Sequence, residues 1–171
     1  DMDHLFESMD QPSIDGSNTY FVSKEAAAMG LKVALSGLGG DELFGGYPSF
    51  RQIPRLAGSL GWIPGLTSAG RAIRYVSAPF LKHLTSPKYA SLFEYGGSFS
   101  GAYLLRRGLY LPWELPDVMD GDMAAAGWRA LQPLVRLEET IGGIADDKSR
   151  VSALELTWYM RNQLLRDSDW A

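Results

Sequence analysis

The chain has 171 residues, of which 46% are hydrophobic and 21% charged, and its net charge is −4. This composition is typical of a folded globular protein rather than a disordered or membrane-spanning one, and the excess of acids argues against nucleic acid as a partner. Cysteine is absent, which excludes disulfides, a thiolate nucleophile and a cysteine metal site. Without a signal-peptide pattern we expect a cytoplasmic protein. Because it begins with aspartate, the chain reads as a piece of a longer one.

Two helices are predicted before residue 31. The apolar spacing over Asp1–Met9 predicts a short first helix, and the polar stretch that follows breaks it. Ser17 or Asn18 can cap a second helix that runs to about Met29, and Gly30 is suited to the left-handed position that ends it.

The next stretch predicts a buried strand and a glycine-rich turn. Residues 32–35 are a short apolar run of the kind found in strands covered on both faces. Three glycines follow, Gly37, Gly39 and Gly40, which let backbone N–H groups approach a ligand at the carboxyl edge of a sheet. Asp41 and Glu42 then open a short helix. Their carboxylates could hold a divalent cation beside a phosphate or simply cap the helix, and the residues alone leave both open.

The rest of the chain is predicted to be helical. The expected helices span about 66–76, 78–84, 88–95, 98–109, 121–131 and 147–166. We interpret Trp62, Trp113 and Trp128 as core anchors, and the pairs Arg71/Arg74 and Arg106/Arg107 as solvated faces.

The final predicted helix is the most informative of these. A wheel of 100° per residue gives it two apolar stripes, one of them including Leu165, and a polar strip that includes Glu155. Asp167 and Asp169 oppose the dipole at its end, which suggests a tertiary or functional reason for them. His4 and His83 stand apart from any catalytic constellation.

The string from Ser36 to Tyr47, SGLGGDELFGGY, resembles the second signature of the synthetase domain of the asparagine synthase (glutamine-hydrolysing) family, usually SGEG(A/S/G)DELFGGY. Upstream, DQPSIDGSNTYFVSKEAAAMGLKVALSG is similar to the segment that leads into this signature. Downstream, SALELTWYMRNQLLRDSDWA is similar to the family's LExxxYLxxxLLxDxD run. The resemblance therefore covers both ends of the chain and the middle less clearly.

The resemblance implies a fragment of the C-terminal synthetase domain, which has an α/β nucleotide-binding fold of the adenine nucleotide alpha hydrolase kind. We expect residues 1–171 to form a partial domain, mostly α-helical with one or two parallel strands. Residues 1–50 would supply the nucleotide edge and residues 51–171 a helical part. The family uses ATP and Mg²⁺ to adenylate the aspartate side chain, and ammonia from glutamine then displaces AMP to give asparagine. The implied partners are these small molecules and a glutaminase domain of the same polypeptide, with a homodimer possible.

The resemblance also assigns roles to individual positions. The nucleotide contacts fall on Ser36 and Gly37, the pyrophosphate loop on Gly39 and Gly40, the metal site on Asp41, and a weaker substrate assignment on Thr19 and Tyr20. Packing and capping are the alternative roles for the last two residues.

Three departures from the family pattern bear on these roles. Leu38 stands at the catalytic position where the family usually has glutamate, and Ile14 stands where a substrate-binding arginine is expected. The SGGxDS pyrophosphate loop, the downstream lysine loop and the glutaminase are absent from these residues, so the isolated fragment is predicted to be inactive. Two alternatives therefore stay open: an amide ligase that acts on another carboxylate, and a non-catalytic synthetase-like module.

Overall fold

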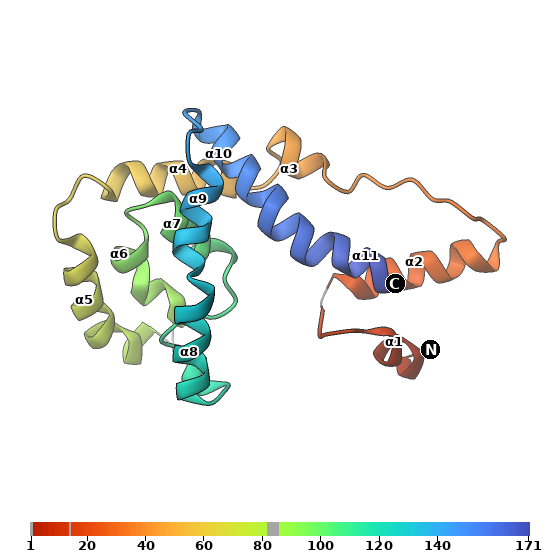
Figure 1. Ribbon diagram of the computed structural model, residues 1–171, viewed down its shortest axis with the longest axis horizontal. Coiled ribbons are helices and arrows are strands. Elements are labelled where there is room, and N and C mark those ends of the chain that lie inside the picture. Colours follow the sequence, from red (N-terminus) through yellow and green to blue (C-terminus); the bar gives the residue numbers. More distant parts are fainter. Residues whose placement is uncertain (1, 14, 82–85) are drawn as a thin grey trace. The chain divides into compact units, whose positions relative to one another are not determined.

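The computed structural model describes residues 2–13, 15–81 and 86–171, and within these ranges the chain forms helices and no strand (Figure 1). It divides into two compact units, residues 1–46 with 152–171, and residues 47–151. The helices are α1 (Met2–Ser8), α2 (Gly16–Ala28), α3 (Gly40–Phe44), α4 (Ser49–Leu60), α5 (Leu66–Leu81), η1 (Pro87–Ser91), α6 (Leu92–Tyr95), α7 (Phe99–Arg107), η2 (Leu115–Asp117), α8 (Gly121–Leu131), α9 (Pro133–Ile141), α10 (Asp147–Leu154), η3 (Glu155–Leu165) and α11 (Arg166–Trp170). In the described ranges, no helix is both long enough and apolar enough to cross a membrane.

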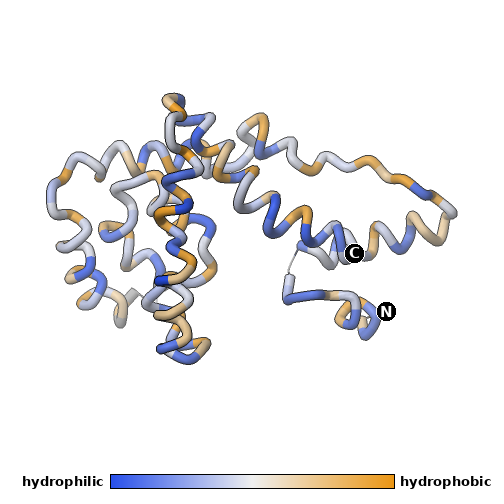
Figure 2. Tube along the Cα trace, in the orientation of Figure 1, coloured by the Kyte–Doolittle hydropathy of each residue, from blue (hydrophilic) through white to orange (hydrophobic). Residues whose placement is uncertain are grey.

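The predicted parallel strand is wrong for this structure. Residues 31–38 form a non-helical connection between α2 and α3, and Figure 2 shows that much of it is apolar. Val33 is 77% exposed and Leu35 is 98% exposed. A strand needs a neighbouring strand to pair its backbone groups, and no described segment supplies one. The apolar run predicted a buried strand, but residues 31–38 are exposed in this structure, and composition could not show whether a pairing partner was present.

The first unit is built on the last helix of the chain. Helix α2 packs against α11, and α3 packs against η3. As predicted, Gly30 ends α2 in the left-handed region, with a φ of 76°, and the N–H groups of Met29 and Leu31 donate to the carbonyls of Glu25 and Ala26. The two sequence regions that resemble the family signature and its upstream segment are thus both positioned by residues 152–171.

The last helix differs from the regular α-helix that was predicted. It continues past residue 166 to Trp170, and its middle part, η3, is wound as a π-helix. Because π-winding changes the angle between successive residues, the wheel drawn for an α-helix misplaces some side chains. Glu155 was assigned to the polar strip but is fully buried, and Leu165 was assigned to an apolar stripe but is half exposed.

The second unit is a helical cluster in which α4 packs on α7 and α5 packs on α6. Ile53 and Ala57, four residues apart on α4, are both buried in its core. Ser98 and Asp120 cap α7 and α8, because their side-chain oxygens accept hydrogen bonds from the N–H groups of Gly101 and Met123. The predicted helices agree with these elements, except that α5 is one helix where two were expected and that residues 88–95 are divided between η1 and α6. Helices α4 and α9 were not predicted. The end of the second predicted helix, with His83, lies outside the described residues.

Two of the surface and core predictions in this unit are wrong. Trp62 was expected in the core but is 76% exposed. Arg74 was expected on a solvated face, yet its side chain is only 12% exposed and its Nε lies 2.7 Å from a carboxylate oxygen of Glu94. The guanidinium of Arg74 also lies over the ring of Trp113, whose indole N–H donates to Ser91. A single sequence gives no signal for a buried ion pair of this kind, since Arg74 and Glu94 are 20 positions apart in the chain.

Candidate functional site

The glycine-rich turn leads from the connection after α2 into α3. The N–H of Leu38 donates to Oγ of Ser36 over 3.3 Å, and the N–H of Gly40 donates to the carbonyl of Gly37 over 3.1 Å. Gly39 has a φ of 91°, a conformation that a residue with a Cβ rarely adopts. Around Gly37 and Gly40 an added Cβ would meet no atom within 4 Å. The turn therefore presents open backbone on the side of these two glycines.

Contacts with the last helix hold this turn in place. The hydroxyl of Ser152 donates to the carbonyl oxygen of Glu42 over 2.7 Å, and the Glu42 side chain is buried. A Cβ added to Gly39 would lie 3.4 Å from the sulfur of Met160. Glu42 therefore has a structural role, whereas the side chain of Asp41, the residue before it, is exposed.

Asp41 is exposed on α3, and its carboxylate has no ion-pair or hydrogen-bond partner in the part of the chain that the structure describes. A Cβ at Gly46 would overlap this carboxylate, which explains the glycine at that position. Over the described residues, no group of three or more His, Asp or Glu side chains could hold a metal ion. Because Mg²⁺ is commonly bound through one or two carboxylates together with substrate phosphates, Asp41 fits a site shared with a nucleotide and does not make a complete metal site.

The remaining predicted site residues fall in two places. Ser36 is exposed, and Leu38 beside it is 40% exposed. Thr19 and Tyr20 lie in the first turns of α2 and are half buried, and the ring of Tyr20 makes an edge-to-face contact with Phe21. Helix α2 packs on α11 while α3 packs on η3. The structure thus places the nucleotide and substrate candidates on different parts of the same supporting helix and does not bring them into direct contact.

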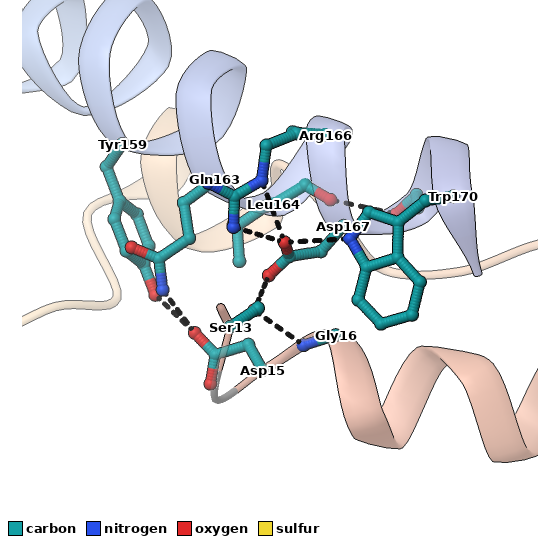
Figure 3. Close-up of polar contacts among 10 residues, drawn as sticks. Ser13, Asp15, Gly16, Tyr159, Gln163, Leu164, Arg166, Asp167 and Trp170 are labelled. Carbon is teal, nitrogen blue, oxygen red and sulfur yellow. Dashed lines mark hydrogen bonds and ion pairs between the residues drawn. The ribbon is translucent and has the colours of Figure 1, made fainter. Parts of the chain in front are cut away.

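A polar cluster fixes the loop that leads into α2 (Figure 3). Asp167, which is 1% exposed, accepts hydrogen bonds from the hydroxyl of Ser13 at 2.5 Å, from Nη2 of Arg166 at 2.6 Å and from the indole N–H of Trp170 at 3.4 Å. The Ser13 hydroxyl oxygen in turn accepts from the N–H of Gly16, at the start of α2. The cluster therefore connects the last helix to the first residues of α2.

Asp15, an acid in the loop that leads into α2, is held by side chains of η3. One carboxylate oxygen of Asp15 accepts a hydrogen bond from the side-chain amide of Gln163 at 2.8 Å and a longer one from the hydroxyl of Tyr159 at 3.3 Å. Figure 3 shows both side chains reaching Asp15 from the same helix. Gly16 lies against the Trp170 indole, where any Cβ would collide. Small size at residue 16 is thus required by packing and not by backbone conformation.

The pKa of Asp167 reflects this environment. Burial of the carboxyl raises its pKa, but the hydrogen bonds from Ser13 and Arg166, the charge of Arg166 and the bond from Trp170 together outweigh burial and leave the pKa below its usual 3.8. The carboxylate is therefore charged at neutral pH, which suits an acceptor of three donors.

Sequence reasoning missed most of this cluster. The acids after the predicted last helix indicated a tertiary role, and the structure supplies one for Asp167. Ser13, Asp15 and Gln163 gave no such signal, because a pair of polar residues about 150 positions apart shows nothing of its contact in a single sequence.

The Asparagine synthase family model matches residues 1–171, so the chain belongs to the asparagine synthase family, as the signature predicted. A curated relative, a probable asparagine synthetase (glutamine-hydrolyzing) of Dictyostelium discoideum, is 48% identical to the chain over 52 residues. That match covers 30% of this chain and 9% of the relative. No solved structure matches the chain significantly.

Proposed function

We propose that this chain supplies one edge of the nucleotide site in an ATP-dependent amidotransferase that converts aspartate to asparagine. The observation that carries the proposal is the open glycine turn, which ends in the exposed and unpaired carboxylate of Asp41 in a chain of the asparagine synthase family. The turn is held by Ser152 and Met160 of the last helix. A preorganised turn of this kind can receive phosphates without first being ordered.

In the proposed reaction an oxygen of the aspartate side chain attacks the α-phosphorus of ATP. An O–P bond forms, the bond to pyrophosphate breaks, and ammonia then attacks the acyl carbon and expels AMP. Ser36 and Gly37 would contact the nucleotide, and the backbone of Gly39 and Gly40 would face the pyrophosphate. Asp41 would hold Mg²⁺, which when bound neutralises charge on the phosphates.

The loop that leads into α2 would shape the acceptor side of the same site. Thr19 and Tyr20 follow this loop, and Asp15, Gln163 and Asp167 restrict its position. A substrate-binding group gains from support of this kind, because a small misplacement of a reacting group lowers the rate strongly. The polar cluster would therefore position the acceptor residues without touching substrate itself.

Leu38 favours a second candidate function, an amide ligase that acts on another carboxylate. A leucine can neither transfer a proton nor guide ammonia as glutamate can, and its half-exposed side chain could pack against a less polar acceptor. The third reading is a non-catalytic module, in which the same turn would bind no nucleotide. Asparagine and AMP formation from aspartate, ammonia and ATP separates the first function from the other two, and ATP binding separates the second from the third.

Asp41→Asn tests the proposed function in the polypeptide that joins this chain to an SGGxDS loop and a glutaminase domain. The change keeps the size of the side chain and removes its charge, so pyrophosphate release should fall by about 10²-fold, equivalent to about 2.7 kcal/mol. Asp122→Asn is the matched control, because Asp122 is also an exposed acid in the first turn of a helix, α8. Equal rates of pyrophosphate release for the two variants would reduce Asp41 to a helix-capping role.

A further inference from the structure

The second unit contains a cavity of about 410 Å³, and all the residues that line it belong to residues 47–151. Its walls come from α4, from η1 with α6, and from α7. Ile53, Ala102 and Leu105 are buried and form apolar wall, and Leu56 and Leu92 extend it. A volume of this size lies in the range of small-molecule sites, which are mostly apolar with a few polar groups.

Two arginines line the same cavity. Arg55 comes from α4 and Arg106 from the last turn of α7, and the lining residues include no aspartate or glutamate. Neither guanidinium has an ion pair or hydrogen bond with any residue that the structure describes. By contrast, Arg74 and Arg150 of the same unit pair with carboxylates.

Tyr89 lines the cavity from η1, and the ammonium of Lys88 lies 5.8 Å from the centre of its ring. The cavity thus has an apolar interior and cationic or phenolic groups around it, with no internal anion to neutralise them. Guanidinium groups match the geometry of a carboxylate, to which they donate two parallel hydrogen bonds. A ligand complementary to both features has an apolar body and one anionic head.

We propose that this cavity binds a small amphipathic monocarboxylate, with its apolar body against Ile53 and Leu105 and its carboxylate held by Arg55 and Arg106. The site is separate from the proposed nucleotide edge, since it lies wholly within residues 47–151. Binding at this cavity therefore does not depend on whether the proposed ligase function is correct.

Isothermal titration of the 171-residue chain with decanoate tests the proposal. We expect one saturable site for decanoate, and binding of decanol and of acetate weaker by about tenfold or more, because each lacks one of the two features. Equal binding of decanol would overturn the role of the arginines, equal binding of acetate would overturn the role of the apolar wall, and no decanoate binding would overturn the site.

Variants locate the binding within the molecule. Arg55→Gln and Arg106→Gln should each weaken decanoate binding by about tenfold, since each removes a charge-assisted contact. Arg129→Gln is the control, because Arg129 is an exposed arginine of the same unit on α8 and does not line the cavity. All three positions are exposed, so the fold should be retained, which circular dichroism checks. A loss of affinity that is the same for all three variants would show a general charge effect and overturn the site.

Discussion

Asp167→Asn should destabilise the first unit of the chain, because it removes the charge on which the polar cluster depends. Asn keeps the size of the side chain but replaces one carboxylate oxygen by an NH₂ group. That group cannot accept from Ser13 or Arg166, the two donors that lie closest to the carboxylate. In either orientation of the amide, one of these two donors therefore faces the NH₂ group and loses its acceptor.

The magnitude follows from burial and charge. Removing one partner of a fully buried ion pair costs about 3–5 kcal/mol, but the side chain of Arg166 is 22% exposed and can recover some hydration. Hydrogen bonds to charged groups contribute about 1.5–3 kcal/mol. We therefore expect a loss of about 2 kcal/mol in the free energy of unfolding.

Asp169→Asn is the matched control, since Asp169 lies on the same helix, is exposed, and should change stability by less than about 0.5 kcal/mol. Urea denaturation followed by circular dichroism measures both variants. Amide hydrogen exchange at Gly16 adds a local readout, because its N–H donates to Ser13 and should exchange faster when Asp167 no longer holds that hydroxyl. Equal stabilities and equal Gly16 exchange in the two variants would refute the role given to Asp167.

Two further predictions concern pH and the catalytic position. Because the pKa of Asp167 is lowered in the folded chain, the unfolded chain binds more protons in the acid range. The contribution of Asp167 to the free energy of unfolding is present above its usual pKa of 3.8. It is lost as the pH falls through the lower pKa of the folded chain. Urea midpoints between pH 5 and pH 2 should fall less steeply in Asp167→Asn, and an unchanged slope would contradict this. Leu38→Glu should change stability by less than about 0.5 kcal/mol, since the side chain is half exposed, and should leave asparagine formation equal or faster in the full enzyme. A slower reaction would favour a different acceptor.

Local patterns in the sequence predicted most helices and the glycine turn. Helix α8 begins and ends where its cap and apolar spacing place it, and Gly30 ends α2 as expected. Helix α4 was not predicted as an element, and Pro54 lies inside it. A proline within a helix removes one backbone hydrogen bond, and burial of Ile53 and Ala57 can offset that loss.

The features that sequence reasoning missed or misplaced depend on partners distant in the chain. The apolar run at residues 32–35 fits a strand locally, but pairing is a property of two segments. The same limit applies to Arg74, which looks solvated until Glu94 is placed beside it. Local pattern thus predicts which groups a segment offers, whereas contacts between segments decide which of those groups are paired and which stay free.

That distinction bears directly on function. Along residues 152–171, the buried or partnered polar groups support other segments: Ser152 holds the residue after Asp41, Gln163 holds Asp15, and Asp167 holds Ser13. Asp41 itself keeps a free carboxylate beside open glycine backbone. A single helix can therefore position both the proposed phosphate-binding turn and the proposed acceptor loop while contributing no reacting group. Substitutions of Ser152 should then alter the geometry of the turn and substitutions of Gln163 or Asp167 that of the loop, whereas substitutions at Asp41 should affect only the chemistry.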